Sequence, residues 1–396
     1  MVVASEVDQV LMRAVDAGVA PGVVALAADD GGVVYAGACG VREIGTAAPM
    51  TLDTVMWIAS MTKAVTSVAA MQLVEQSRIG LDEPLGKRIP ELASLQVLDG
   101  FDDGGVPRLR AARRPVTLRQ LLTHTAGFAY HIWNAETRRY LDYAGIPTIG
   151  ECKTVTLGTP VVFEPGERFE YGISIDWVGK VVERLSGQSL EDYFREHIFG
   201  PLAMNDSGFL LRPEQRTRLA SMHERQPDGS LAAIEFEMSQ QPEFFMGGGG
   251  LYSTGSDYLR FLRMLLGDGE LDGVRVLRPE TVAEMGKNHI GDLSVGRITT
   301  AMPASSNDFE FFPGLDKKWG LAGMITMEDA PTGRSAGSLA WAGLANTYFW
   351  IDPSKRITGV LLTQILPFAD TRVLDLFEQF ERGIYAGYTE RGLRPA

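Results

Sequence analysis

Residues 57–74 read WIASMTKAVTSVAAMQLV, and this stretch decides the predicted fold. Over 64–74 the residues are apolar on nearly every side of a helix, a pattern typical of a buried helix. Ser60 and Lys63 stand three residues apart at its start, so their side chains share one helix face. We therefore predict a buried helix over 61–77 that places an amine within reach of a hydroxyl.

The chemistry of this serine and lysine depends on burial. A serine hydroxyl is a weak nucleophile and needs an adjacent base. Lysine supplies that base only where its pKa lies well below the model value of about 10.4, and burial lowers it because desolvation disfavours the charged form. The apolar neighbours Trp57, Ile58 and Val65 predict burial of Lys63. The alternative is that Ser60 only caps the helix and Lys63 is a surface charge.

Strands are predicted near both ends of the chain, with helices between them. An amphipathic helix over 7–15 precedes a β-hairpin, and a final helix covers 371–386. The fold class is therefore α/β of the α+β type. An antiparallel sheet flanked by helices comes from 1–75 and 240–396, and a mainly helical domain from 76–239. The predicted strands span 22–28, 33–38, 319–326, 338–344, 347–351 and 357–364.

The middle of the chain shows helix signals separated by long connections. A short helix is predicted over 118–123, and an apolar stripe predicts a longer one over 177–185. Ser189 with Asp192 resembles a capping box at the start of the next helix. The stretch 98–115, rich in Asp, Gly and Arg, is predicted as a loop.

Composition restricts the partners. The 396 residues carry a formal net charge of −13, and an acidic chain is repelled by nucleic acid and by anionic lipid. The sequence shows neither an apolar run of membrane-span length nor a secretion signal, so we expect a cytoplasmic protein without a membrane span. Cys39 and Cys152 are expected to be reduced thiols. The five histidines lack metal-binding spacing, so no metal or other cofactor is expected.

Five motifs follow one another along nearly the whole chain. They cover 57–63, 118–127, 165–171, 248–254 and 341–343. With these motifs the chain resembles the serine β-lactamase and penicillin-binding-protein superfamily. Within it, the chain is similar to the family VIII carboxylesterases and the related fungal statin-side-chain acyltransferase. The resemblance implies the fold of that superfamily, an antiparallel sheet flanked by helices plus a mainly helical domain.

The resemblance also implies the catalytic residues. Ser60 is the nucleophile, and Tyr171 works with Lys63 in moving protons to and from it. Which of these two acts as base is left open, because a tyrosinate could serve if nearby cations lowered its pKa. The backbone N–H groups of Ser60 and Leu344 are implied as the oxyanion hole.

Two further polar residues are expected near this centre. Asp176 either orients Lys63 or Tyr171, or it caps the helix that begins beside it. His124 follows a short helical run, where a structural hydrogen bond is expected.

The third motif of the superfamily predicts the substrate class. Lactamases carry Lys-Thr-Gly there, with a cation for a substrate carboxylate, whereas this chain has Trp341-Ala342-Gly343. Trp341 supplies an apolar wall, and Gly343 is expected to let substrate approach the backbone. A carboxylesterase for uncharged esters is therefore preferred. The alternatives are an acyltransferase, a β-lactamase or D-amino-acid peptidase, and a penicillin-recognising sensor without turnover. The other predicted pocket residues are Phe128, Tyr130, Trp133, Trp177, Phe245 and Met246, and for several of them the alternative is a place in the core.

A competing motif lies near the C-terminal end of the chain. Residues 333–337 match GxSxG, the nucleophile elbow of α/β-hydrolases, around Ser335. That elbow needs a helix after its serine and a histidine later in the chain. Here a strand pattern follows, and the last histidine is His289. We therefore predict a hairpin turn rather than a second nucleophile.

Overall fold

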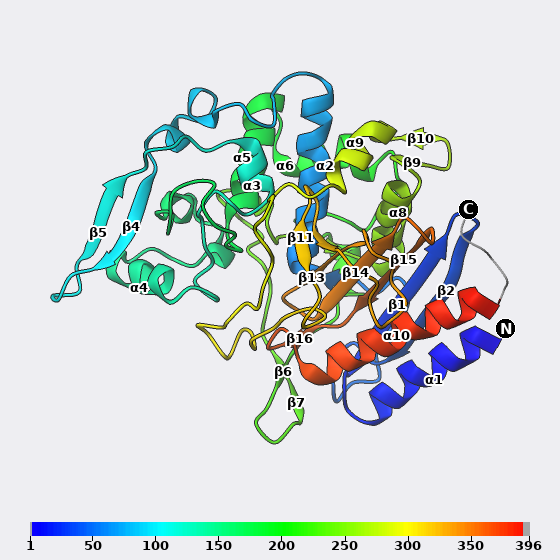
Figure 1. Ribbon diagram of the computed structural model, residues 1–396. Helices are drawn as coiled ribbons and strands as arrows, with labels where there is room; N and C mark the ends of the chain where they lie inside the picture. The colour runs from blue at the N-terminus through cyan, green and yellow to red at the C-terminus, as the bar shows by residue number, and fades with distance from the viewer. Residues whose placement is uncertain (1, 391–396) are drawn as a thin grey trace.

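A seven-stranded antiparallel sheet forms the centre of the computed structural model, which describes residues 2–390 (Figure 1). The strand order is β11-β12-β13-β14-β15-β1-β2, so the first strands of the chain pair with the last. This confirms the predicted fold class, with strands from both ends of the chain in one sheet. The bounds are β1 Gly22–Asp29, β2 Gly32–Gly40, β11 Lys317–Trp319, β12 Met324–Thr326, β13 Leu339–Gly343, β14 Thr347–Asp352 and β15 Ile357–Leu362.

Helices cover both faces of this sheet. On one face α1 (Val2–Asp16) lies beside α10 (Thr371–Glu390), and on the other lies α8 (Gly255–Leu266) (Figure 1). Neighbouring residues of β14 show the two faces directly. Phe349 packs on Tyr258 of α8, and Trp350 packs on Phe380 of α10. Since successive strand residues point to opposite sides, the two layers bury alternate side chains of the sheet.

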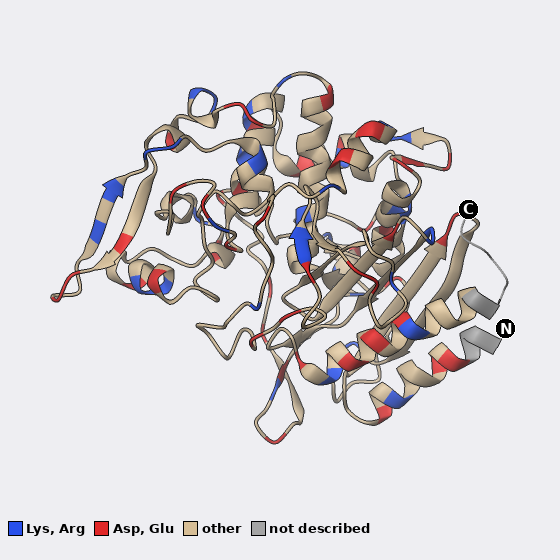
Figure 2. Cartoon of the chain, viewed as in Figure 1, with Lys and Arg blue, Asp and Glu red and all other residues tan. Residues whose placement is uncertain are grey.

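The central strands β13 and β15 lack charged residues, since both faces of the sheet are covered there. In Figure 2 the strands β13 and β15 carry no charged residue, while α1 and α10 show both signs on their outer surfaces. All residues of β13, β14 and β15 are buried. Continuously buried strands of this kind tolerate apolar runs rather than alternation. Across residues 2–390, we find no helix long and apolar enough to cross a membrane.

Two predictions, one of a loop and one of a strand, need correction. The stretch 98–115 is not a loop, because β4 (Gln96–Phe101) and β5 (Pro107–Ala111) form an antiparallel hairpin. The Asp102 side chain closes the hairpin turn by accepting the N–H of Val106 at 2.8 Å. The Asp- and Gly-rich part of this stretch therefore forms the turn. The predicted strand 319–326 is two strands, β11 and β12, because Gly320 and Gly323 turn the chain between them.

The helix α2 (Thr62–Glu75) packs against α5 (Ser174–Ser186). Segment 76–239 contains strands as well as helices, and the predicted domain boundaries stay a prediction. The other helices are α3 Leu118–Leu122, α4 Ala135–Ala144, α6 Leu190–Phe194, α7 Pro213–Arg216 and α9 Pro279–Met285. The short strands are β3 Met56–Trp57, β6 Met222–Arg225, β7 Leu231–Ile234, β8 Tyr252–Ser253, β9 Glu270–Leu271, β10 Val274–Arg275 and β16 Ile365–Leu366.

Candidate active site

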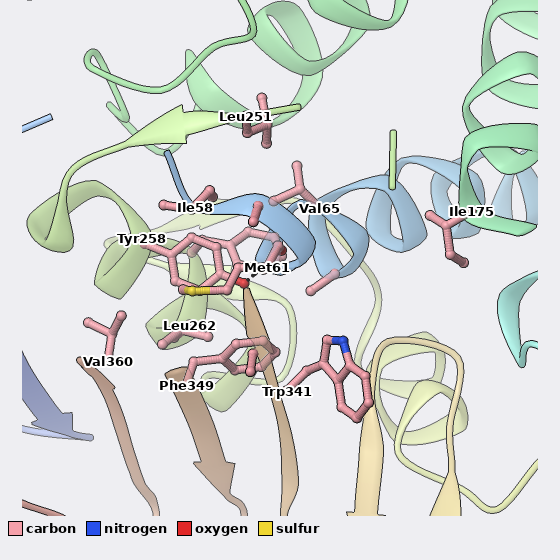
Figure 3. Close-up of a cluster of buried hydrophobic side chains, with 14 of the residues drawn as sticks. Ile58, Met61, Val65, Ile175, Leu251, Tyr258, Leu262, Trp341, Phe349 and Val360 are labelled. Carbon is pink, nitrogen blue, oxygen red and sulfur yellow. Dashed lines mark hydrogen bonds between the residues drawn. The ribbon is translucent and has the colours of Figure 1, made fainter. Parts of the chain in front are cut away.

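The start of the buried helix is fixed by packing on the sheet. A single turn of 3-10 helix, Ala59–Met61, leads into α2. Figure 3 shows Met61 beside Tyr258 and Phe349, and the Tyr258 hydroxyl donates to the Met61 carbonyl at 2.9 Å. Ala59 has a φ of +45°, a strained conformation for a residue with a side chain. The backbone before Ser60 is therefore held in an unusual bend by its surroundings.

Lys63 contacts Ser60 directly. Its Nζ lies 2.9 Å from the Ser60 Oγ, 3.1 Å from the Tyr130 Oη and 2.5 Å from the Gly248 carbonyl oxygen. The Lys63 residue is only 3% exposed. Burial lowers the pKa of the Lys63 amine to about 7, and the charge of Asp176 partly opposes that shift. A lysine of this kind has a large neutral fraction near neutral pH.

Tyr171 lies on the same centre but stays protonated. The Lys63 Nζ is 4.7 Å from the centre of the Tyr171 ring, and the Trp341 Nε1 donates to the Tyr171 hydroxyl at 2.9 Å. Burial raises the pKa of Tyr171, while hydrogen bonds with Ser60 and Trp341 act in the opposite direction. The phenol form therefore dominates, which favours Lys63 rather than a tyrosinate as the base.

Asp176 and His124 support this centre from behind. Asp176 is fully buried, and its Oδ1 accepts the N–H of Gly248 at 2.8 Å. It does not cap α5, because the residue at the cap position is Ile173. The His124 Nδ1 accepts the N–H of Gly172 at 3.3 Å, and its ring packs 4.8 Å from that of Tyr171. Burial lowers the pKa of His124, so this ring is neutral.

A cavity of about 290 Å³ opens in front of Ser60. Its walls are mostly aromatic and aliphatic, as in sites for small organic ligands. Five of the predicted residues line it, namely Ser60, Leu344, Tyr130, Trp133 and Met246. The other lining residues were not among the predicted pocket residues; they are Trp57, Ala59, His131, Ile132, Thr148, Ile149, Gly150, Phe236, Glu237, Met238 and Gly249.

Three predicted pocket residues lie elsewhere. Phe128 packs on Trp177 at a ring distance of 6.2 Å, and Trp177 lines a different cavity beside Lys180. Phe245 packs on Phe209 at 5.2 Å. The structure does not bring these three aromatic residues into the lining of the Ser60 cavity. The apolar character of these residues predicts that they are buried, but it does not predict which cavity or part of the core they line.

Trp341 and Gly343 contact other groups of the protein and do not line the Ser60 cavity. Trp341 lies among the buried residues of Figure 3 and holds the Tyr171 hydroxyl through its indole N–H. A Cβ at Gly343 would stand 2.3 Å from the Ile58 carbonyl and 2.3 Å from the Thr347 Oγ1. Gly343 is therefore required for β13 to pack against the backbone before Ser60. This protein contact, rather than access for substrate, explains the glycine.

The GxSxG segment forms a connection between β12 and β13. The N–H of Ser335 donates to the Asp352 Oδ2 at 2.9 Å, and its carbonyl accepts the Ser338 hydroxyl at 2.7 Å. The residue before it, Arg334, forms a buried ion pair with Glu381. The segment leads into a strand rather than a helix, as predicted, so it lacks the geometry of a nucleophile elbow.

The fold and the serine–lysine pair define a class, the serine acyl enzymes of the β-lactamase fold. A family model described as Beta-lactamase matches residues 7–382, and the chain belongs to that family. The lovastatin esterase of Penicillium rubens is 33% identical over 398 residues, covering 96% of this chain and 98% of that protein. The monacolin J acid methylbutanoyltransferase of Aspergillus terreus is 34% identical over 388 residues, covering 93% and 92%.

Solved structures agree with these relatives. The unliganded simvastatin synthase LovD of Aspergillus terreus, as its selenomethionyl derivative, superimposes with a TM-score of 0.84 at 30% identity, covering 98% of this chain and 99% of that one. EstCE1, described as a hydrolase with promiscuous acyltransferase activity, gives a TM-score of 0.77 at 25% identity, covering 97% and 98%. Esterases and acyltransferases thus share this fold at similar distance from the chain.

Proposed function

We propose that this protein is a carboxylesterase of the family VIII type, which hydrolyses uncharged carboxylic esters through an acyl-enzyme at Ser60. The observation that carries the proposal is the buried amine of Lys63, 2.9 Å from the Ser60 hydroxyl oxygen. A neutral amine has two N–H donors and one lone pair. With the donors directed to the Gly248 carbonyl and the Tyr130 oxygen, the lone pair faces Ser60. That arrangement suits a general base.

The acylation step follows from this geometry. Lys63 takes the hydroxyl proton while the Ser60 Oγ attacks the carbonyl carbon of the ester. The carbonyl oxygen becomes an oxyanion, held by the N–H groups of Ser60 and Leu344, two residues that line the same cavity. The bond between the carbonyl carbon and the alcohol oxygen then breaks. Tyr171 gives its proton to that oxygen and regains one from Lys63, so the alcohol leaves neutral.

Water completes the cycle by deacylation. A water molecule attacks the acyl carbon and passes a proton by way of Tyr171 to Lys63. The bond from that carbon to the Ser60 Oγ breaks, and the Oγ recovers the proton. The carboxylic acid leaves, and both side chains return to their starting state. The proposal requires no cofactor, and both this and the cytoplasmic location stay predictions.

The charge around the cavity supports uncharged substrates. Among the described lining residues there is no Lys or Arg, and Glu237 is the carboxylate at the rim. Arg216, the ion-pair partner of Glu237 at 2.6 Å, uses its charge on that carboxylate. A substrate carboxylate would therefore meet an acidic group and find no free cation, in contrast to the lysine of Lys-Thr-Gly enzymes. This supports an esterase over a β-lactamase or a D-amino-acid peptidase.

Acyl transfer is the second candidate, and two observations favour it. The relatives include a methylbutanoyltransferase at 34% identity, and EstCE1 combines hydrolysis with transfer. In transfer, an acceptor alcohol replaces water at the acyl carbon and its proton takes the same route to Lys63. Hydrolysis and transfer then differ only in which nucleophile reaches the acyl-enzyme.

Turnover of p-nitrophenyl butyrate, with and without an acceptor alcohol, tests the proposal. We expect Ser60→Ala to lose turnover by about a thousandfold or more while circular dichroism shows an intact fold. A fluorophosphonate adduct is expected at Ser60 by mass spectrometry. Near-normal turnover in Ser60→Ala, or an adduct at another serine, would contradict the assignment. Nitrocefin turnover that rivals ester turnover would favour a lactamase, and labelling without turnover would favour a sensor.

A further inference from the structure

A second cavity, of about 160 Å³, lies beside Tyr171. Residues 169–171 form one wall of it, and the segment 294–299 contributes another. Trp133 lines both this cavity and the one in front of Ser60. Its ring packs 5.3 Å from the Tyr171 ring, and its indole N–H donates to the Ser306 hydroxyl at 3.0 Å. Trp133 therefore lies at the border of both cavities, in a position fixed by its contacts with Tyr171 and Ser306.

The two cavities differ in chemistry. The first holds Ser60 among apolar and aromatic walls. The second is lined by the polar residues Glu170, Ser294, Arg297 and Thr299, and the Arg297 guanidinium pairs with Asp308 at 2.9 Å. The Glu170 Oε1 accepts from the Asn134 amide at 2.9 Å, and burial raises the pKa of its carboxyl group. A carboxyl group fixed in this way can hydrogen-bond a hydroxyl of a ligand, whereas the first cavity favours an alkyl or aryl group.

We propose that the two halves of an ester substrate divide between these cavities. The acyl group occupies the cavity of Ser60, and the alcohol part occupies the cavity of Tyr171, Glu170 and Arg297, which suits alcohols with further hydroxyl groups. This inference rests on the proposed function. Its physical reason is that the alcohol oxygen must meet the Tyr171 phenol when its bond to the acyl carbon breaks, and Tyr171 lines the second cavity.

The second cavity then also holds the acceptor in acyl transfer. The acceptor hydroxyl loses its proton to Lys63 by way of Tyr171, and its oxygen bonds to the acyl carbon. The bond from that carbon to the Ser60 Oγ breaks, and the Oγ takes the proton. The balance between hydrolysis and transfer is set by how well the alcohol cavity retains an alcohol against water.

Three glycines allow a matched test. A Cβ at Gly296, in the alcohol cavity, or at Gly150, in the acyl cavity, meets no atom within 4 Å. Neither glycine has a positive φ, so a side chain introduces no backbone strain there. Gly158 shares both properties but lines neither cavity. The same phenyl ring can therefore be added at three exposed places, by Gly296→Phe, by Gly150→Phe and by the control Gly158→Phe.

Two substrate series separate the halves of the ester. One varies the acyl chain from acetyl to octanoyl on p-nitrophenol, and the other varies the alcohol of a butyrate from methanol to a hydroxylated naphthylmethanol. We expect Gly296→Phe to lower kcat/KM for the large alcohol about tenfold relative to methanol, with the acyl preference unchanged. Gly150→Phe is expected to lower octanoyl relative to acetyl turnover by a similar factor, with the alcohol preference unchanged. Gly158→Phe changes neither ratio.

The outcomes distinguish this inference from the proposed function. An unchanged alcohol preference in Gly296→Phe, or a changed acyl preference, would overturn the assignment of the second cavity while ester turnover itself stands. Thr299→Phe, on the same wall, gives the same readout if Gly296→Phe fails to fold. Absence of ester turnover and of Ser60 labelling in the unmodified chain would overturn both proposals together.

Discussion

Asp176 holds the backbone of Gly248 in place, with the Asp176 Oδ1 accepting the Gly248 N–H at 2.8 Å. The carbonyl oxygen of Gly248 in turn accepts a hydrogen bond from the Lys63 amine at 2.5 Å. A buried carboxylate thus fixes the short stretch of backbone that positions the proposed base. The close fit requires a glycine, because a Cβ at Gly248 would stand 2.5 Å from the Asp176 Oδ2 and 2.8 Å from the Tyr130 Oη.

Gly248→Ala is therefore expected to lower kcat/KM for p-nitrophenyl butyrate by about a hundredfold, because it displaces a group that aligns Lys63. Steady-state kinetics measures this, with circular dichroism as the check on folding. Gly179→Ala is the matched control. Its Cβ would meet the flexible end of Leu190 at 3.0 Å, next to the same glycine run, and its turnover is expected to stay normal. Near-normal turnover in Gly248→Ala would show that the contact is not needed.

Asp176→Asn tests the charge of the carboxylate without removing its hydrogen-bond acceptor. The Asp176 charge raises the pKa of Lys63, against the larger effect of burial. Removing that charge lowers the pKa of Lys63, so the amine stays neutral to lower pH. The value of kcat/KM rises with the neutral fraction of the base, so its pH profile has an acidic limb near pH 7 in the parent protein. In Asp176→Asn this limb is expected to move to lower pH. A limb that moves upward, or stays in place, would contradict this coupling.

The contact between Ser60 and Lys63 could be predicted from the sequence because its geometry is local. Ser60 and Lys63 lie within one helical turn, and the apolar residues of the helix that follows predict that both are buried. The contacts that complete the centre are not local. The Gly248 carbonyl and the Tyr130 hydroxyl are 185 and 67 residues away from Lys63, and no spacing pattern links them to it.

Predictions based on composition succeeded only in part, for a physical reason. Phe128 and Trp177 were predicted to line the substrate pocket, with the core as the alternative, and both are buried away from the Ser60 cavity. The hairpin of β4 and β5 was predicted as a loop because its Asp and Gly residues, which form the turn, dominate the composition of the whole stretch. Where tertiary contacts decide the outcome, composition identifies a kind of environment but not a place.

Ser335→Ala is expected to leave ester turnover and fluorophosphonate labelling unchanged. The contacts of Ser335 in the β12–β13 connection use its backbone N–H and carbonyl, which alanine retains. Ser60→Ala, assayed in parallel, supplies the comparison for loss of the nucleophile. Loss of turnover in a folded Ser335→Ala protein would instead restore the GxSxG motif as a candidate nucleophile.

The two tyrosines beside Lys63 are expected to differ in effect. Tyr171→Phe removes the proposed proton donor to the leaving alcohol, so kcat is expected to fall about a hundredfold to ten-thousandfold. Tyr130→Phe removes one hydrogen-bond partner of the Lys63 amine, at 3.1 Å, and a loss nearer tenfold is expected. Esters with better leaving groups need less proton donation. The Tyr171→Phe defect should therefore shrink from methyl butyrate to p-nitrophenyl butyrate, while the Tyr130→Phe defect stays constant. The reverse pattern would assign proton donation to Tyr130 rather than to Tyr171.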